Sequence, residues 1–343
     1  MQEKLNCNFI FGVENTSVKR LDTSCFNKSI DVPNKPIGNS NWYYQPNLLK
    51  LTKEYEVIIN DLGVFCISAW LLLLKSKLTK QKIYNWDHGW YGRESLLKKW
   101  IKRAYFGLAD GAFIYGNYAR QLMIENGFDG SKLFVIHNSL DYDAQLKLRN
   151  EITPSDIYTR HFGNNNKTLI FIGRLTEVKR LDMLIQAVAK LKQEGKQYNI
   201  VLVGDGVMKD VLQKQAAEAG VDVWFYGACY DERTNAELIY NADLCVAPGN
   251  VGLTAMHTMV FGTPVITHDD FKWQMPEFEA IKAGETGDFF TRGDVNSLAQ
   301  AIEHWFDTHG NDREAVRKAC YNEIDTQWTP QFQIEVIKKA INE

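Results

Sequence analysis

The sequence lacks a long hydrophobic run, a paired-cysteine motif and a strong net charge. Its longest apolar run, from Val64 to Leu74, has 11 residues, whereas a membrane-spanning helix needs about 20. The first twelve residues also lack the basic start and apolar core of a secretory signal. These absences argue against an integral membrane protein and predict a cytoplasmic one.

The six cysteines form no CxxC motif, because no two of them are closely spaced. Several lie in apolar runs, as Cys245 does, so we expect buried free thiols in a reducing compartment. The formal net charge of −3 provides no overall basic field, which argues against a nucleic-acid partner. With 45% hydrophobic and 24% charged residues, the composition excludes wholesale disorder, collagen and a small disulfide scaffold.

Charge is distributed unevenly along the chain. Residues 1–150 contain 20 Lys and Arg against 14 Asp and Glu, a net +6, whereas residues 151–343 contain 19 against 28, a net −9. A chain of 343 residues corresponds to about two domains of roughly 150 residues. A basic half and an acidic half therefore indicate two domains with different partners.

Short β-branched or aromatic runs alternate with amphipathic stretches, a pattern typical of βαβ units with parallel sheets. In the first half, strands are expected at 8–11, 29–32, 57–60, 83–86, 111–115 and 132–136, and helices at 66–76, 94–108 and 117–127. In the second half, strands are expected at 168–172, 200–203, 223–226, 244–247 and 265–267, and helices near 182–194, 208–219, 231–241, 253–261, 295–306, 312–321 and 330–341. Pro154, Gly163 and three consecutive asparagines indicate a linker over 150–167.

The start of the chain departs from this pattern. A Rossmann-like unit opens with a strand, a glycine-containing turn and a helix, but no helical periodicity follows the expected strand at 8–11 before Ser29. We expect the first strand and helix of the unit to be missing. The alternative is a divergent first unit with a native Met1.

The strongest motif runs from Phe171 to Asp182, where an apolar strand ends in a glycine turn before a helix. Ligands bind at the carboxyl edge of the strands in such sheets. Gly173 permits close backbone approach, and Arg174 and Lys179 lie five residues apart in the turn. Both side chains bind diphosphates well, arginine in a bidentate manner. The alternative is two surface cations on a loop.

Two further strands end in glycine-rich loops. Gly204 follows the first of them, which taken alone is only turn chemistry. In the second loop, Gly249 and Gly252 precede a helix expected to start near Leu253, and helix N-termini suit phosphate oxygens. His257, one turn into that helix, is expected to face the same cleft.

In this order, the motifs resemble the nucleotide-binding domain of glycosyltransferase family 4, which has the GT-B fold. The resemblance is strong over residues 168–290 and weak over 109–141. It implies an α/β protein of two Rossmann-like domains with a cleft between them. An acceptor-binding domain would cover residues 1–155, a nucleotide-sugar-binding domain 165–325, and a last helix at 326–343 would cross back to the first domain.

The resemblance also implies a set of donor-binding residues. Arg174 and Lys179 would stabilise the donor's diphosphate, and helix N–H groups at Leu253 and Thr254 would bind it. The residues expected around the rest of the donor are glycines and one aromatic residue: Gly173, Gly204, Gly249, Gly252, Gly227 and Tyr226. Tyr226 and Gly227 would flank the nucleobase.

One departure concerns two carboxylates. The family carries a Glu that touches the donor sugar and, after seven residues, a Glu that touches the ribose; here these positions are Gly249 and His257. Histidine can still hydrogen-bond a ribose hydroxyl, and the alternative for His257 is a structural role. Glu277 or Glu279 is the candidate for the sugar contact, or else both cap the helix that Pro276 opens.

In the first half, His88 lies in a glycine-broken loop at the end of an expected strand. By the resemblance it binds the sugar or polarises the acceptor; otherwise it is an ordinary loop histidine. Two basic clusters, Lys75–Lys82 and Lys98–Arg103, are either solvated faces or contacts with anionic lipid. Lipid contact would fit a polyprenyl-diphosphate-linked acceptor and a protein at the inner face of the cell membrane.

Together these features predict a hexosyltransferase that uses a nucleotide-diphosphate sugar and a glycan or lipid-linked acceptor in surface polysaccharide synthesis. The resemblance implies retention of configuration, with no metal and no further cofactor. Two alternatives stay open because both carboxylates are missing. The chain is then a catalytically weak nucleotide-sugar binder, or a GT-B nucleotide-sugar epimerase.

Overall fold

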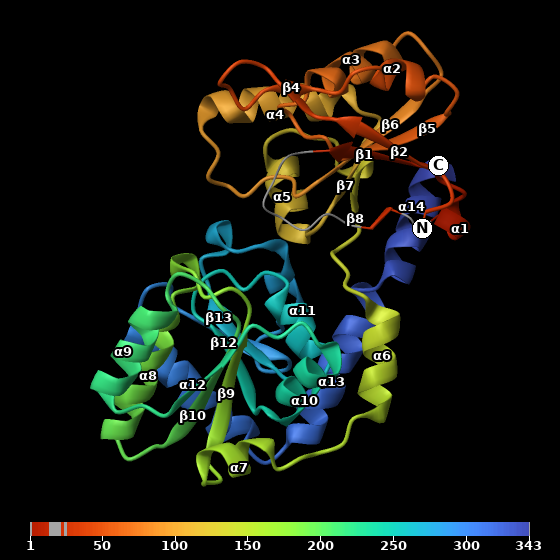
Figure 1. Ribbon diagram of the computed structural model, residues 1–343. Helices are drawn as coiled ribbons and strands as arrows, with labels where there is room; N and C mark the ends of the chain where they lie inside the picture. Colours follow the sequence, from red (N-terminus) through yellow and green to blue (C-terminus); the bar gives the residue numbers. More distant parts are fainter. Residues whose placement is uncertain (1, 14–21, 24–25, 343) are drawn as a thin grey trace. The chain divides into compact units, whose positions relative to one another are not determined.

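The computed structural model describes residues 2–13, 22–23 and 26–342, and the chain forms two compact units. Unit 1 comprises Met1–Ile136 and Gln331–Glu343, and unit 2 comprises His137–Pro330. Each unit is an α/β body (Figure 1). The first boundary therefore lies at residue 136, earlier than the residue 155 expected from the sequence.

Unit 2 is built on six parallel strands in the order β11-β10-β9-β12-β13-β14. Along the chain this order reads 3-2-1-4-5-6, the doubly wound arrangement whose winding reverses between β9 and β12. The strands are β9 (Lys167–Ile172), β10 (Tyr198–Val203), β11 (Val223–Gly227), β12 (Leu244–Ala247), β13 (Val265–His268) and β14 (Gly287–Phe290).

Helices cover both faces of this sheet (Figure 1). One face carries α8 (Leu181–Gln193), α9 (Lys209–Ala219) and α12 (Val295–His309), and the other carries α10 (Glu232–Asn241), α11 (Thr254–Met259) and α13 (Arg313–Gln327). Every residue of central β12 is buried, whereas edge strand β11 is only half buried. This burial explains why the central strands read as continuous apolar runs.

Helix α8 shows how the pattern specifies packing. Leu181, Leu184, Ile185 and Val188 recur at helical spacing, and all four are buried. Its basic residues lie in the last turn, near the negative end of the helix dipole. The helix therefore covers the sheet with one apolar stripe and leaves its polar side outward.

Unit 1 contains a four-stranded parallel sheet in sequence order: β5 (Val57–Asn60), β6 (Lys82–Asp87), β7 (Gly111–Ile114) and β8 (Leu133–Val135). One side packs on α3 (Ile67–Ser76), α4 (Leu96–Leu108) and α5 (Asn117–Glu125). The other side packs on α14 (Pro330–Asn342), where Ile337 and Ala340 lie against Tyr84. The Tyr84 hydroxyl donates to the Ala340 carbonyl at 2.8 Å, which fastens the last helix to this unit.

The first expected strands form a separate parallel pair, β1 (Phe9–Val13) with β2 (Ser29–Pro33). Short elements follow them: β3 (Lys35–Pro36), β4 (Tyr43–Tyr44) and α2 (Leu48–Leu51). The chain opens with α1 (Gln2–Leu5). Residues 14–21 lie outside the described residues, so the expectation about the missing first helix stays a prediction.

The prediction of two parallel α/β units is confirmed, but the linker expected over 150–167 is not an unstructured segment. It contains α7 (Ile157–Phe162), and α6 (Tyr142–Glu151) precedes it. The Tyr158 hydroxyl donates to the Leu238 carbonyl at 2.5 Å, which fixes α7 against α10. Gly163 ends this short helix in a left-handed conformation, so one of the breakers assigned to a linker is a helix cap.

The cysteines and the helices bear on two further expectations. Cys7, Cys66, Cys229, Cys245 and Cys320 are free thiols, and Cys25 lies outside the described residues. Cys66, Cys245 and Cys320 are buried, as expected, whereas Cys7 and Cys229 are only half buried. Among the helices of the described ranges, none is both long enough and apolar enough to cross a bilayer.

Candidate functional site

The loops that follow β9 and β12 lie at the point where the winding of the unit 2 sheet reverses. Open α/β sheets bind ligands outside the carboxyl ends of the strands at such a point. The loop after β9 contains Gly173, Arg174 and the 3₁₀ turn η3 (Glu177–Lys179), and the loop after β12 contains Gly249, Asn250 and Gly252. The sequence motifs therefore come together at one edge.

Lys179 spans these two loops. Its Nζ donates to the backbone carbonyl and to the side-chain Oδ1 of Asn250, both at 2.8 Å. Burial lowers the pKa of Lys179 to about 8; the negative charge of Glu277 opposes this and the positive charge of Arg174 adds to it. The ammonium group thus bonds to neutral oxygens here, and an anionic ligand would raise its pKa.

Arg174 follows Gly173 directly at the end of β9, and its side chain is exposed. Its charge acts on Lys179, so the two cations expected to share one diphosphate lie within electrostatic range of each other. Two like charges near each other at a ligand-binding edge are unfavourable until an anion joins them. The arrangement fits a doubly charged phosphate group.

Close backbone packing holds the loops in place. A Cβ atom at Gly204 would lie 1.9 Å from the carbonyl oxygen of Gly173, and a Cβ atom at Gly249 would lie 1.9 Å from that of Val178. The Gly249 N–H also donates to the Lys179 carbonyl at 2.9 Å. Position 249, which the resemblance assigns to a sugar-binding Glu, therefore has no room for any side chain.

The start of α11 is tied to the same strand end. The Thr254 hydroxyl donates to the Ile172 carbonyl at 2.8 Å, and Leu253 is exposed beside it. The Val251 N–H donates to Oε1 of buried Gln274 at 2.8 Å. Gly252 has a left-handed backbone conformation, and a Cβ atom added to it would lie 3.9 Å from Lys179 Nζ. The loop thus brings the backbone of Gly252, two residues before α11, near the ammonium group.

Glu277 is the buried acid of this edge. It lies in the 3₁₀ turn η5 (Pro276–Ala280) with only 2% of its surface exposed. Oε1 accepts from the Asn138 amide at 2.9 Å, and Oε2 is buried with no hydrogen-bond partner. Glu279 is only half buried. A buried carboxylate oxygen without a donor is costly, and a ligand hydroxyl would supply one.

His257 pairs with an acid on the neighbouring helix. Its Nε2 lies 2.9 Å from Oε1 of Glu232, the first residue of α10. Burial would raise the pKa of Glu232, but hydrogen bonds from His257, Gln145 and Asn235 hold it below its usual range. The sequence offered no signal for this pair, because 25 residues separate its members.

Tyr226 and Gly227 end the edge strand β11. The Tyr226 ring packs on Trp224 at 5.2 Å between centroids, and burial raises the pKa of its hydroxyl. The Gly227 carbonyl accepts from the Gly204 N–H at 2.8 Å, which links this strand end to the loop after β10. Their contact with a nucleobase stays a prediction.

In unit 1, His88 follows β6 at the corresponding edge of that unit's sheet. Its ring lies 4.8 Å from the ring of Tyr115, and its Nδ1 is buried with no hydrogen-bond partner. Sequence reasoning missed two acids at the same edge, Asp61 and Asp87. Burial raises the pKa of Asp61, and the negative charge of Asp87 raises it further. Both acids stand where a strand ends, a positional signal that the sequence contained.

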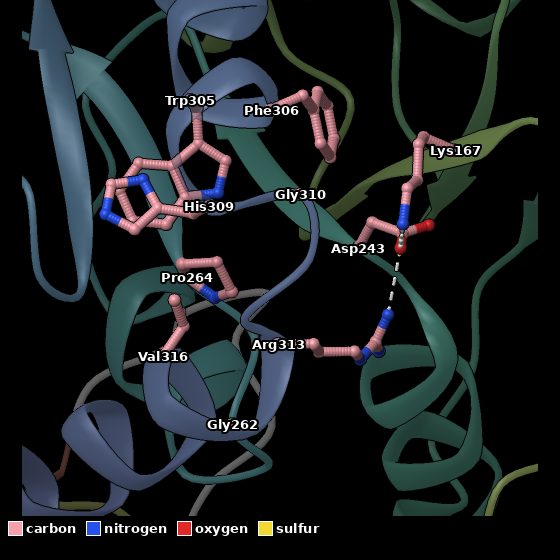
Figure 2. A pocket seen from close by; sticks show the side chains of 10 residues that line it. All are labelled: Lys167, Asp243, Gly262, Pro264, Trp305, Phe306, His309, Gly310, Arg313 and Val316. Carbon is pink, nitrogen blue, oxygen red and sulfur yellow. Dashed lines mark hydrogen bonds and ion pairs between the residues drawn. The ribbon is translucent and has the colours of Figure 1, made fainter.

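The pocket in Figure 2 lies at the opposite edge of the unit 2 sheet, where β9, β12 and β13 begin. It contains none of the expected site residues: Lys167, Asp243, Gly262, Pro264, Trp305, Phe306, His309, Gly310, Arg313 and Val316 line it. Asp243 accepts from Lys167 at 3.1 Å and from Arg313 at 3.0 Å. Both cations bond to the one carboxylate, so we assign the pocket to structure. The described residues contain no group of three His, Cys, Asp or Glu side chains that could hold a metal ion.

Comparison with known proteins identifies the family. Residues 159–323 match the family model for group 1 glycosyl transferases. The Bacillus subtilis protein EpsD, named as a candidate glycosyltransferase, is 30% identical over 296 residues, which cover 81% of this chain and 75% of EpsD. The chain belongs to the group 1 glycosyltransferase family.

Other relatives match over shorter stretches. A 41.2 kDa protein in the cps region of Klebsiella pneumoniae is 25% identical, with 66% of this chain and 63% of that protein covered. A GDP-mannose-dependent phosphatidylinositol dimannoside mannosyltransferase of Mycobacterium tuberculosis is 33% identical over 29% of this chain and 26% of its own length. The chain thus spans less than two thirds of both relatives.

Solved structures show the same GT-B fold. Anabaena HepE in complex with UDP has a TM-score of 0.68 at 19% identity, with 92% of this chain and 86% of that one covered. A glycosyltransferase from Rickettsia africae has a TM-score of 0.69 at 17% identity with the same coverage.

Proposed function

We propose that the chain transfers a sugar from a nucleotide-diphosphate sugar, bound by unit 2, to a glycan or lipid-linked acceptor bound by unit 1. The observation that carries the proposal is the pair of cations at the winding reversal: Lys179 hydrogen-bonds only to neutral oxygens, and Arg174, whose charge acts on it, is exposed. Family membership and the UDP bound to HepE, a protein of the same fold, support a nucleotide-sugar donor.

The proposed chemistry follows from where charge develops. As the bond between the anomeric carbon and the diphosphate oxygen breaks, negative charge grows on the diphosphate, and Arg174 and Lys179 stabilise it electrostatically. The acceptor hydroxyl oxygen forms the new bond on the same face, and its proton passes to the leaving diphosphate. We propose this retaining, metal-independent course for the chain, with Glu277 accepting a hydrogen bond from a donor-sugar hydroxyl.

The acceptor belongs, in this proposal, to surface polysaccharide assembly. The Klebsiella relative is a protein of a cps region, which supports that pathway. His88, with its unpartnered Nδ1 and nearby tyrosine ring, is the proposed acceptor contact. Small-molecule sites combine aromatic side chains with a few placed polar groups, and this pair offers both.

The test is a two-part assay with the full chain. A thermal-shift screen against nucleoside mono- and diphosphates and nucleotide sugars should give stabilisation by diphosphates above monophosphates, because a ligand specific to the folded state raises apparent stability. Labelled nucleotide sugars are then incubated with and without acceptor glycolipids. Transfer to acceptor supports the proposal; binding without turnover favours a weak binder, and an altered sugar without acceptor favours an epimerase.

We also propose that α4 touches an anionic membrane surface. Leu96, Leu97 and Trp100 are 78%, 70% and 71% exposed, and Lys98 is exposed between them. Lys102 and Arg103 instead donate to the carbonyls of Gly89 and Asn126. Exposed apolar side chains beside a free cation suit the headgroup boundary of an acidic bilayer.

Vesicle sedimentation tests this contact. The chain should bind vesicles that contain phosphatidylglycerol and not pure phosphatidylcholine, and W100S with L97S should reduce binding by about tenfold or more. Lys77→Ala is the control, because Lys77 already pairs with Asp110 at 3.3 Å. Equal binding to both lipids, or no loss in the double variant, would contradict the proposal.

A further inference from the structure

The pair of Glu232 and His257 combines elements from three places in unit 2. His257 lies on α11, Glu232 begins α10, and Gln145 lies on α6. His257 Nε2 and Gln145 Nε2 both approach Glu232 Oε1, at 2.9 Å and 2.8 Å. Because an ionised carboxylate only accepts, the histidine nitrogen is the donor. Two side-chain donors from different helices thus fix the position of the carboxylate.

The second oxygen of this carboxylate keeps acceptor capacity. Glu232 Oε2 has one long contact in the structure, 3.4 Å to the Asn235 amide. The Glu232 side chain is 36% exposed, whereas that of His257 is 18% exposed. A carboxylate has about four acceptor positions. Glu232 can therefore accept further hydrogen bonds from a molecule outside the protein.

The position of the pair relates it to the diphosphate site. Thr254, at the start of α11, is bonded to the end of β9, and His257 follows three residues later. Three residues of helix rise span about 4.5 Å, so the backbone of His257 lies about one turn along α11 from the residue that is bonded to the end of β9. Glu232 also follows the loop after β11, on the carboxyl side of the sheet.

From this geometry we infer that Glu232 accepts hydrogen bonds from the ribose hydroxyls of a nucleoside diphosphate whose phosphates are held at Arg174 and Lys179. In dinucleotide-binding folds of this kind, an Asp or Glu about 20 residues beyond the glycine turn hydrogen-bonds the ribose. Glu232 offers the same chemical group from the end of another strand of the sheet. His257 is then a positioning residue: it orients the carboxylate and does not itself carry the contact. This inference rests on the proposed function and adds a specificity-determining residue to it.

The experiment compares ribose with deoxyribose ligands by calorimetry on the full chain. The probes are UDP and GDP with their 2′-deoxy forms, using whichever base binds the wild type. The wild type should prefer the ribose form by about 10- to 100-fold, the range of a charge-assisted hydrogen bond. E232A should reduce this ratio to about 1, and E232Q should give an intermediate value because the amide oxygen still accepts.

Three variants separate specificity from structure. Glu237 lies on the same helix as Glu232 and accepts from the Ser155 hydroxyl at 2.8 Å. The control variant Glu237→Gln should therefore leave the ratio of ribose to deoxyribose affinity unchanged. H257A should lower the ratio partly, while R174A should weaken ribose and deoxyribose ligands equally. Circular dichroism and melting temperature verify that each variant is folded.

The outcomes distinguish the inference from the function on which it rests. If neither diphosphate binds the wild type, the proposed function fails and the inference with it. If diphosphates bind but the wild type has no ribose preference, or E232A weakens both ligands equally, the inference alone is overturned. A ratio lost in E232A, reduced in H257A and kept in E237Q establishes Glu232 as the ribose contact.

Discussion

The charged side chains at the two edges of the unit 2 sheet have different hydrogen-bond partners. At the edge where the strands begin, Asp243 bonds to Lys167 and Arg313 through one oxygen and to the Thr168 N–H at 2.8 Å through the other. At the edge where the strands end, Lys179 has only neutral acceptors and Glu277 has one oxygen without a donor. We call the first edge complete because both cations bond directly to the carboxylate, and the second incomplete because the hydrogen bonds of Lys179 go to neutral groups.

This difference separates structure from function within one domain. Charges that satisfy one another stabilise the fold and offer nothing to a ligand, although they line a pocket (Figure 2). Charges left unbalanced lower stability and are retained where a ligand completes them. Substitutions at the two edges should therefore affect different measurements.

The largest expected effect is on catalysis at the incomplete edge. R174A should lower turnover by about 10²–10³-fold, the range for removal of one group that stabilises developing charge. Its melting temperature should stay close to that of the wild type, because the Arg174 side chain is exposed. Steady-state kinetics with the donor found in the screen measure the effect. Turnover equal to the wild type would contradict the role of Arg174.

At the complete edge, D243A should act on stability alone. It leaves Arg313 and Lys167 without their shared carboxylate and should lower the free energy of unfolding by about 2–3 kcal/mol, below the full range for a buried pair because both cations are partly exposed. Urea unfolding measures the loss. Affinity for the nucleoside diphosphate should not change, and a change of tenfold would remove the distinction between the edges.

At the incomplete edge, K179M should affect ligand affinity more than stability. Methionine has no charge to desolvate, but it leaves both Asn250 oxygens without their donor. These effects oppose each other, so the free energy of unfolding should change by no more than about 1 kcal/mol. Diphosphate affinity should fall at the same time. Urea unfolding and calorimetry on the same preparation measure both. A variant that loses stability and keeps affinity would show that Lys179 is a structural cation.

The sequence predicted the incomplete edge only in part. Strand ends, glycine loops and the cations Arg174 and Lys179 follow from local pattern, because the carboxyl ends of parallel strands share one edge. The hydrogen-bond partners of these side chains do not follow from local pattern. Asn250 lies 71 residues from Lys179 and Asn138 lies 139 residues from Glu277, and no periodicity specifies such pairs.

Packing decided the remaining differences. Pro154 and Gly163, which usually interrupt helices, led to the prediction of a linker where α7 forms. A helix this short is not stable by itself and depends on tertiary contacts, which the local sequence does not show. Position 249 matched a family carboxylate by counting alone, yet its Cβ would overlap the Val178 carbonyl. Backbone approach of this kind depends on the geometry of two loops and has no local signature.

The smallest expected effect is a partial change in the protonation of Lys179, and it tests the incomplete edge most directly. The pKa of Lys179 is lowered to about 8 by burial, so at pH 8 about half of the free protein carries the proton. Folding stability should rise as pH increases from about 8 toward the ordinary lysine value, because the folded state binds the proton less tightly than the unfolded state.

A bound diphosphate reverses the shift in the pKa of Lys179, so binding at pH 8 should take up about 0.5 proton. Calorimetry in two buffers of different ionisation enthalpy measures this uptake. K179M should abolish it and D243A should not; uptake that persists in K179M would mean that another group at the edge titrates with the ligand.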